Sequence, residues 1–401
     1  MSDEKSLQTR LIHHDYRAPD GFAAFPTAIH HASTVLFKDV AALRSRNWQD
    51  KTGYTYGLHG TPTTFILEER IATLEGGLQT LLTPSGLAAI TLVNAALLKS
   101  GDEVLIPDNA YGPAKELARN ELARWGIAHR FYDPMDVESL RAALSPATRL
   151  VWLEPPGSVT MEFPDLPALL RLLRERPELV VALDNTWGVG LAFDAFALGG
   201  EGEALGADIS IQALTKYPSG GADLLMGAVT TRDMALHQRI MATHMRMGWG
   251  VGVNDVEAVL RALPSLTLRY AAQDRGGREL ASWWAKRPEV VAVLHPALPG
   301  SPGHAHWAAL CSQAAGLFSI VFDHRYASAQ VDAFVDALKL FRIGYSWAGP
   351  VSLVVPYDLP AARLGAAGVA SGTVVRFSIG LEATLDLIAD CEQALPALVA
   401  G

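Results

Sequence analysis

The stretch ADISIQALTKY, residues 207–217, contains a mostly apolar run of strand length that ends directly on a threonine and a lysine. Such a run, 209–214, is typical of a strand buried within an open α/β sheet. Ligands of these sheets bind at the carboxyl ends of the strands. We therefore predict that this strand delivers Thr215 and Lys216 to a ligand site at the edge of the sheet.

Two other predicted strands end on suggestive residues. The run 180–183 ends on Asp184, and the run 78–83 leads into Ser85-Gly86-Leu87 at the start of an apolar helix. Each residue alone has a plainer explanation, because polar residues after a strand are usually solvated or cap a helix. Together they supply an imine-forming lysine, an acid for a pyridine nitrogen and N–H groups for a phosphate. Their order predicts a pyridoxal 5'-phosphate (PLP) site, with Lys216 as the Schiff-base lysine.

The wider pattern predicts the organisation of the chain. Strand-like runs alternate with helical patterns, which indicates β-α-β units with a mostly parallel sheet. Predicted strands of the first part are 103–107, 129–132, 149–154, 179–184, 208–213 and 225–230. Later segments indicate a smaller α+β unit with strands at 290–294, 317–322, 352–355 and 374–379, after a helical stretch, 255–286, that is kinked near Pro264. We expect an N-terminal arm (1–62), a large α/β domain (63–256) and a small C-terminal α+β domain (257–401).

Composition excludes several classes of protein. Of the 401 residues, 49% are hydrophobic and only 19% are charged, which is enough apolar surface for a large core and excludes a disordered chain. The net charge of -9 argues against a nucleic-acid partner. No membrane span or signal peptide is evident, so we expect a soluble, cytoplasmic protein. The histidine pairs lack the company of a metal site, and no metal is expected.

Several ordered motifs resemble the trans-sulfuration family of PLP-dependent enzymes of cysteine and methionine metabolism. The resemblance covers nearly the whole chain. It rests on YTYGLHGTPTT (54–64), PSGLAAI (84–90), EPPGSVTMEFPD (154–165), the 184–187 and 207–217 segments, YSW (345–347) and RFSIGLE (376–382). It implies a type I aminotransferase-like fold.

The resemblance also implies roles for individual residues. Lys216 would hold PLP, Asp184 would pair with its ring nitrogen, and Tyr111 would stack on the ring and move protons. Gly86, Leu87 and Thr215 would bind the phosphate. Tyr56 would reach that phosphate from a neighbouring subunit and take part in catalysis, which implies dimers that share active sites. A homotetramer of two such dimers is expected, and a simple dimer stays open as the alternative. Arg376 would bind the carboxylate of a small amino-acid substrate, and Ser346 would line the same pocket.

The sequence departs from the family pattern at two positions. Leu58 stands where an arginine usually reaches the neighbour's phosphate, and Ala213 stands where a serine is common. Phosphate binding would then use fewer charged or hydroxyl contacts. His59 could compensate in part, although adjacent residues of an extended arm point to opposite sides.

The reaction implied is β-elimination on L-cystathionine and related cysteine S-conjugates. Relatives that perform γ-elimination or γ-replacement share the cofactor residues, so this alternative stays open. Trp187 and Gly157-Ser158 favour the β reaction, because γ-enzymes tend to have phenylalanine and a Thr-Asn pair there. A non-catalytic PLP-binding protein is a further alternative. A Rossmann dehydrogenase is disfavoured, because Leu205 replaces the third glycine of the fingerprint.

Overall fold

The structure is a computed structural model. It describes residues 6–13, 20–22, 24–49, 51–200, 202–359 and 372–399. Parts of the expected N-terminal arm (1–5, 14–19, 23 and 50) lie outside the described residues, as does Glu201. Within the described ranges, no helix is long and apolar enough to cross a membrane.

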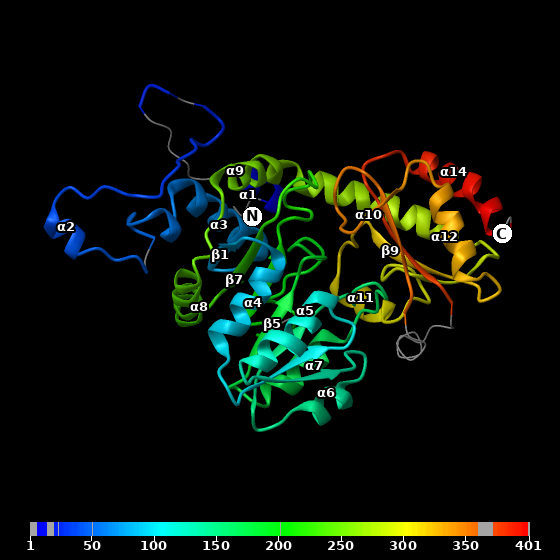
Figure 1. The fold of residues 1–401 in the computed structure, drawn as a ribbon, viewed down its shortest axis with the longest axis horizontal. Helices are drawn as coiled ribbons and strands as arrows, with labels where there is room; N and C mark the ends of the chain where they lie inside the picture. Colours follow the sequence, from blue (N-terminus) through cyan, green and yellow to red (C-terminus); the bar gives the residue numbers. More distant parts are fainter. Residues whose placement is uncertain are drawn as a thin grey trace.

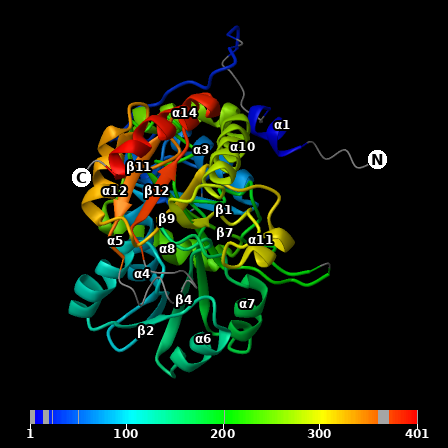
Figure 2. The ribbon, with the colours of Figure 1, turned by 90° about the vertical axis from the view of Figure 1, so that its right-hand side faces the viewer.

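A seven-stranded sheet forms the centre of the first part of the chain (Figures 1 and 2). Its strands lie in the order β1-β7-β6-β5-β4-β2-β3. Their bounds are β1 Gln79–Thr83, β2 Glu103–Pro107, β3 Ala128–Tyr132, β4 Thr148–Leu153, β5 Val180–Asp184, β6 Ile209–Ala213 and β7 Gly227–Thr231.

Strand β7 is the exception to the parallel arrangement. Five neighbouring strands, β3 to β6, run parallel, whereas β7 pairs antiparallel with both β6 and β1. The segment between β6 and β7 contains no helix, and without a crossover helix the chain returns in the opposite direction. The mostly parallel sheet that the sequence predicts is confirmed, but its last unit is not a β-α-β unit.

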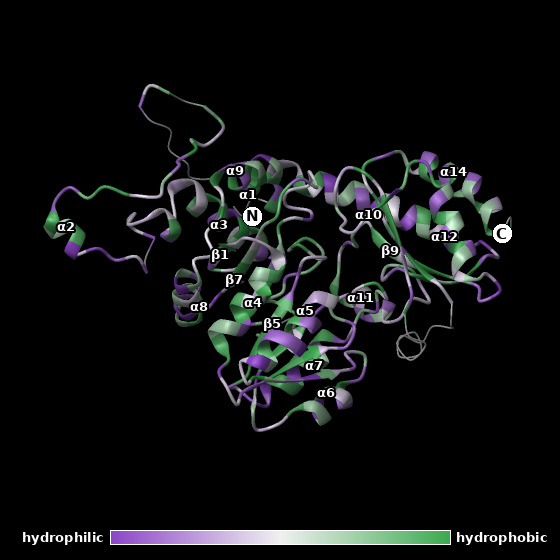
Figure 3. Ribbon diagram, in the orientation of Figure 1, coloured by the Kyte–Doolittle hydropathy of each residue, from purple (hydrophilic) through white to green (hydrophobic). Residues whose placement is uncertain are grey.

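Helices cover both faces of this sheet. Alternate residues of β4 and β5 belong to two separate apolar clusters: Leu150, Trp152 and Ala182 pack on the α4 and α8 side, and Val151 and Leu183 on the α7 side. Burial on both faces explains the apolar sequences of these strands, and the hydrophobic colouring of the strands in Figure 3 follows from it. The helices of this part are α3 Pro62–Glu75, α4 Gly86–Leu97, α5 Gly112–Leu117, η2 Ala118–Leu122, α6 Val137–Ala143, α7 Leu166–Arg174 and α8 Met234–Met247.

The N-cap of helix α3 is Thr61. The side chains of Thr61 and Thr64 form a reciprocal capping box, with Pro62 at the first helical position. Gly76, with φ +71, ends the helix in the left-handed conformation. The expected kink is confirmed at Pro264, where the 3-10 turn η3 Leu263–Ser265 separates α9 Val253–Ala262 from α10 Leu266–Trp284.

A second, five-stranded sheet lies beyond α10, in the order β10-β11-β12-β9-β8. Its central strand is β12, and α10, α12 and α14 pack on one face (Figures 1 and 2). The elements are β8 Val290–Leu294, α11 His304–Leu310, β9 Leu317–Phe322, α12 Ser328–Ala337, β10 Arg342–Ile343, β11 Leu353–Tyr357, β12 Val374–Ser378, α14 Thr384–Ala394 and η4 Leu395–Leu398. The two sheets fall on either side of residue 256, and the domain boundaries themselves stay predictions.

The segment that precedes α3 extends away from both sheets (Figure 1). It contains α2 Val40–Arg44 and the turn η1 Gly57–His59, while α1 Leu7–Ile12 packs against α3. Large apolar side chains along this segment are exposed, including Leu36, which is 90% exposed.

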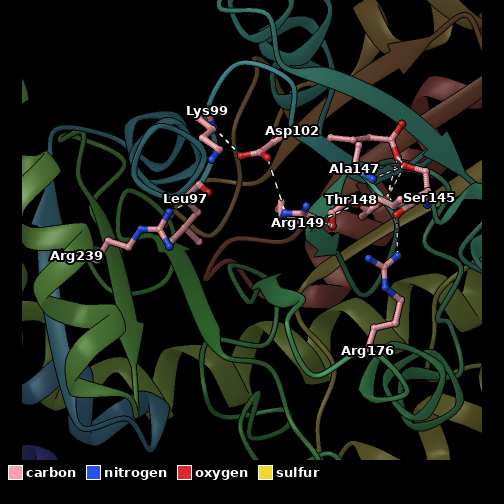
Figure 4. Close-up of polar contacts among 11 residues, drawn as sticks. Leu97, Lys99, Asp102, Ser145, Ala147, Thr148, Arg149, Arg176 and Arg239 are labelled. Carbon is pink, nitrogen blue, oxygen red and sulfur yellow. Dashed lines mark hydrogen bonds and ion pairs between the residues drawn. The ribbon is translucent and has the colours of Figure 1, made fainter.

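A polar network closes the amino-terminal edge of the large sheet. Arg149 and the backbone of Lys99 both contact Asp102, and Arg176 donates to the carbonyl of Ser145 (Figure 4). Glu103, the first residue of β2, accepts hydrogen bonds from Ser145 and Thr148. These charged groups are already paired with the backbone and side chains at the starts of the strands. Ligands of open α/β sheets bind at the opposite, carboxyl ends of the strands, so we expect the site there.

Candidate active site

The carboxyl ends of β5 and β6 are joined by a short hydrogen-bond chain. Thr186 donates from both its N–H and its hydroxyl to the Asp184 carboxylate, at 3.0 and 2.5 Å. The same hydroxyl accepts the N–H of Ala213 at 2.9 Å. Thr186 therefore fixes the orientation of Asp184 relative to the strand that leads to Lys216.

Lys216 lies in a tight turn after β6 and points toward the second sheet. Its Nζ is 2.6 Å from the hydroxyl of Ser346 and 5.5 Å from the ring centre of Trp347. The turn is held by Tyr217, a buried side chain whose hydroxyl accepts the N–H of Gly316 at 2.9 Å. Burial, assisted by the charge of Arg376, lowers the pKa of Lys216 to about 8. Contacts between the two parts of the molecule thus position the lysine.

Two carboxyl groups share this edge of the sheet. Burial raises the pKa of Asp184, while the Thr186 hydrogen bonds and the charge of Lys216 oppose that rise. Burial also raises the pKa of Glu154, and the nearby Asp184 adds to the effect. A protonated pyridine nitrogen beside Asp184 would favour its ionised form. The carboxylate is therefore suited to a cationic ring.

Tyr111 stands over the same edge. Its backbone N–H donates to both oxygens of Glu154, at 2.9 and 3.0 Å. Burial raises the pKa of Tyr111, and the charges of Asp184 and Glu154 raise it further. The phenol therefore keeps its proton at neutral pH.

The start of α4 supplies an anion-binding geometry. The Ser85 hydroxyl caps the helix by accepting the N–H of Ala88 at 3.0 Å, which leaves the N–H groups of Gly86 and Leu87 without an acceptor among the described residues. A β-carbon on Gly86 would lie 2.6 Å from Cβ of Ala213, so the close approach of helix and strand requires glycine here. The Thr215 hydroxyl accepts the N–H of Met226 at 3.0 Å. The free N–H groups at this helix start fit a phosphate.

Arg376 lies on β12, the central strand of the second sheet, and is 8% exposed. Its guanidinium makes no ion pair or hydrogen bond with the residues that the structure describes. It stacks on the ring of Tyr357, with 5.3 Å between the guanidinium carbon and the ring centre. A buried cation that has no carboxylate partner in the described part of the chain is suited to an anionic ligand.

A cavity of about 840 Å³ adjoins these groups, a size in the range of small-molecule sites. It touches the residues above at Thr215 and Ser346, and neither Lys216 nor Asp184 lines it. Tyr345 and the 250–252 segment form other parts of its wall.

The arm residues do not join this group within their own chain. The ring of Tyr56 contacts His59 at 6.0 Å, and its backbone bridges to Thr34. Leu58 lines a small cavity of about 30 Å³ and approaches Gly250. His59 bonds to Thr55 through Nδ1 at 2.6 Å. The expected role of Tyr56 at a neighbour's phosphate stays a prediction.

Sequence reasoning missed three groups at the site. Glu154 directly follows β4, and Asp184 is the last residue of β5. The expectation that ligands bind at the carboxyl ends of strands could therefore have identified Glu154 as well. Thr186 was visible as part of the 184–187 segment, but nothing in its spacing indicated that it connects two strands. Tyr357 carried no signal, because its contact with Arg376 depends on the register of β11 and β12.

Trp187, which the sequence analysis singled out, is buried against Phe163, with 6.3 Å between the ring centres.

The fold and this set of side chains define a PLP-dependent enzyme. The two-sheet architecture and the lysine, acid and helix N-terminus provide what the cofactor requires. The chain belongs to the Cys/Met metabolism PLP-dependent enzyme family, which matches residues 8–396.

Comparison with known proteins extends over nearly the full chain. The chain is 39% identical to the cystathionine beta-lyase of Bordetella avium, over 98% of this chain and 99% of that protein. It is 32% identical to the cystathionine gamma-lyase of Rattus norvegicus, over 86% of each chain. The crystal structure of metB from Corynebacterium glutamicum superposes with a TM-score of 0.87 at 28% identity, covering 98% of both chains.

Proposed function

We propose that this protein is a carbon–sulfur lyase that converts L-cystathionine and water to homocysteine, pyruvate and ammonia by β-elimination. The observation that carries the proposal is the half-buried amine of Lys216, which the charges of both Asp184 and Arg376 reach, together with the buried guanidinium of Arg376, which has no ion pair among the described residues. The strong similarity to a cystathionine beta-lyase over the full length supports the choice of substrate.

Bound PLP supplies an electron sink for the pair of electrons left when the substrate loses its Cα proton. Asp184 holds the proton on the ring nitrogen. Arg376 binds the substrate carboxylate with its planar guanidinium, which fixes the orientation of Cα. The N–H groups of Gly86 and Leu87, together with Thr215, hold the phosphate at the start of α4.

Lys216 is the proposed base that takes the Cα proton. At pH 7 a pKa of about 8 leaves roughly one lysine in ten neutral, against fewer than about one in a thousand for an ordinary lysine. Ser346, 2.6 Å away, fixes the amine and lines the substrate pocket. Tyr111 retains its proton, so it is suited to stack on the ring and donate a proton to the departing sulfur.

The alternative is γ-elimination, the reaction named for the rat relative. Gly157 favours the β reaction in this chain. A β-carbon at this position would lie 2.2 Å from Nδ2 of Asn109 and 2.7 Å from Oε2 of Glu162. The threonine that γ-enzymes tend to have there would not fit unless this loop moved.

We further propose the assembly implied by the resemblance. The exposed apolar residues of the arm are suited to contact with another subunit. In the proposed homotetramer, Tyr56 reaches the phosphate of a neighbour, and the arm (1–62), large domain (63–256) and small domain (257–401) have separate roles. The cytoplasm is the proposed location.

Product analysis tests the reaction. The purified holoenzyme incubated with L-cystathionine should release pyruvate and homocysteine in equal amounts. Both products can be measured by chromatography. A yield of mainly 2-oxobutyrate and cysteine would show γ-elimination instead.

Covalent trapping tests the lysine. Borohydride should attach the reduced cofactor to Lys216, and Lys216→Ala should lose both the attachment and turnover. Lys115→Ala, which removes another lysine close to the site, should still be labelled. Peptide mapping that places the label on any other lysine would contradict the assignment.

A further inference from the structure

The buried guanidinium of Arg376 has an aromatic support. Arg376 pairs in register with Val355 of β11, and Tyr357 lies two residues farther along that strand. Side chains two residues apart in a strand project from the same face. The Tyr357 ring therefore extends diagonally beneath the guanidinium, which lies 5.3 Å from the ring centre.

Other polar groups on this face have other partners. Ser319, opposite Arg376 on β9, donates its hydroxyl to the carbonyl of Val159 at 2.6 Å. The Ser378 hydroxyl accepts the N–H of Ala348 at 3.4 Å. Among the described residues, the ring of Tyr357 is thus the contact that can orient the Arg376 side chain.

An arginine side chain has four rotatable bonds, and a bidentate pair with a carboxylate requires one orientation of its plane. A ring face attracts the cation and restricts that plane. The hydroxyl of Tyr357 makes no hydrogen bond with a described residue, whereas its ring contacts the guanidinium directly.

We propose that Tyr357 is a positioning residue that holds the Arg376 guanidinium ready for the substrate carboxylate. This inference rests on the proposed function, in which Arg376 binds that carboxylate. The ring acts on binding of the carboxylate and leaves the proton transfers at Lys216 unchanged. Its loss therefore raises KM and leaves kcat nearly constant.

Substitutions in the holoenzyme test the proposal. Tyr357→Phe keeps the ring, and Tyr357→Leu and Tyr357→Met remove it. We expect the two ringless variants to raise KM for L-cystathionine by roughly 3- to 30-fold with kcat within about twofold, and Tyr357→Phe to restore the wild-type KM. The inhibition constant of propionate should rise in parallel, while that of the uncharged propionamide should not change.

A matched control lies in the same domain. Arg325 stacks on Tyr326 with a distance of 5.0 Å, away from Arg376. Tyr326→Leu removes a comparable stack and should leave KM and propionate inhibition unchanged, which separates positioning from a general loss of stability. Thermal unfolding and cofactor absorbance of each variant identify any that is misfolded.

Each outcome has a separate meaning. If Tyr357→Leu or Tyr357→Met keeps the KM and the propionate inhibition constant of the wild type, the positioning role of Tyr357 is overturned. A Tyr357→Phe variant as weak as the ringless ones would show that the hydroxyl, and not the ring, is required, and would also overturn it. If Arg376→Lys leaves propionate inhibition unchanged, the proposed role of Arg376 fails instead.

Discussion

Glu75 is a buried carboxyl group beneath the candidate site. It lies at the end of α3, accepts a hydrogen bond from Asn185 at 3.2 Å and a short one from Ser210, and forms no ion pair with a described residue. Burial is the main cause that raises its pKa to about 8, and the charges of Asp194 and Asp184 add to the rise. The carboxyl group is therefore mostly protonated in the folded protein at neutral pH.

This shift has a predictable effect on stability. Between the unfolded pKa near 4.5 and the folded pKa near 8, the folded state binds more protons than the unfolded state, so stability falls as pH rises through that window. Glu75→Gln stays neutral and avoids this loss. The free energy of unfolding of Glu75→Gln minus that of the wild type should therefore be larger at pH 9 than at pH 5.5, by ~2 kcal/mol or more.

Urea unfolding of the cofactor-free protein at the two pH values measures the difference. Glu69→Gln provides the control, since Glu69 lies on the exposed face of the same helix. If the difference in unfolding free energy between the wild type and Glu75→Gln is the same at both pH values, the proposed shift in the pKa of Glu75 is wrong.

At the scale of single elements, the start of α4 connects the helix to the sheet. Alanine normally stabilises a helix relative to glycine by about 1 kcal/mol. At Gly86 the new methyl group would lie 2.6 Å from Cβ of Ala213, an overlap between two atoms that cannot rotate away. Overpacking of this kind costs about 1–3 kcal/mol, so the steric effect prevails over the helix propensity.

Gly86→Ala should therefore displace the helix start and weaken phosphate binding. We expect the dissociation constant for PLP to rise by about tenfold or more, measured by fluorescence or absorbance titration after removal of the cofactor. Gly200→Ala is the matched control, because a β-carbon there has nothing within 4 Å. Unchanged PLP affinity in Gly86→Ala would mean that this helix does not hold the phosphate.

At the scale of the whole molecule, the arm exposes apolar side chains that no described residue of the same chain covers. Phe22, Phe25, Leu36 and Val40 are more than half exposed, and Tyr56 contacts none of the cofactor residues of its own chain. A partner that covers these side chains would explain both observations. The exposed arm supports the proposed sharing of sites between subunits.

Mixed oligomers test that sharing. Tyr56→Phe and Lys216→Ala should each impair activity alone. In a two-fold dimer with one of each chain, one site draws an intact lysine from the first chain and an intact tyrosine from the second. Random mixing makes about half of the dimers mixed, so activity should reach about one quarter of the wild type.

Co-expressed and separately tagged chains allow the mixed dimers to be purified and assayed, and these should reach about half of the wild-type activity, because one of their two sites is intact. The comparison is with the average activity of the two single variants. If verified mixed oligomers show no activity above that average, Tyr56 serves its own chain.

The sequence by itself determined where several strands lie along the chain and which chemical groups stand at their ends. Strands β2, β8 and β9 have the predicted bounds because each is a short, mainly apolar run that ends at a turn, and both features are local signals. Lys216, Asp184 and Gly86 were predicted in the same way, as residues at strand ends and at a helix start.

Only the tertiary structure decided how these groups meet. The antiparallel direction of β7 depends on a connection that has no helix, and the N-cap of α3 depends on how Thr61 and Thr64 share hydrogen bonds. The 2.6 Å contact of Lys216 with Ser346 and the stacking of Tyr357 on Arg376 each join residues from different strands or domains. Local sequence patterns carry no information on such distances, because packing of the two sheets sets them.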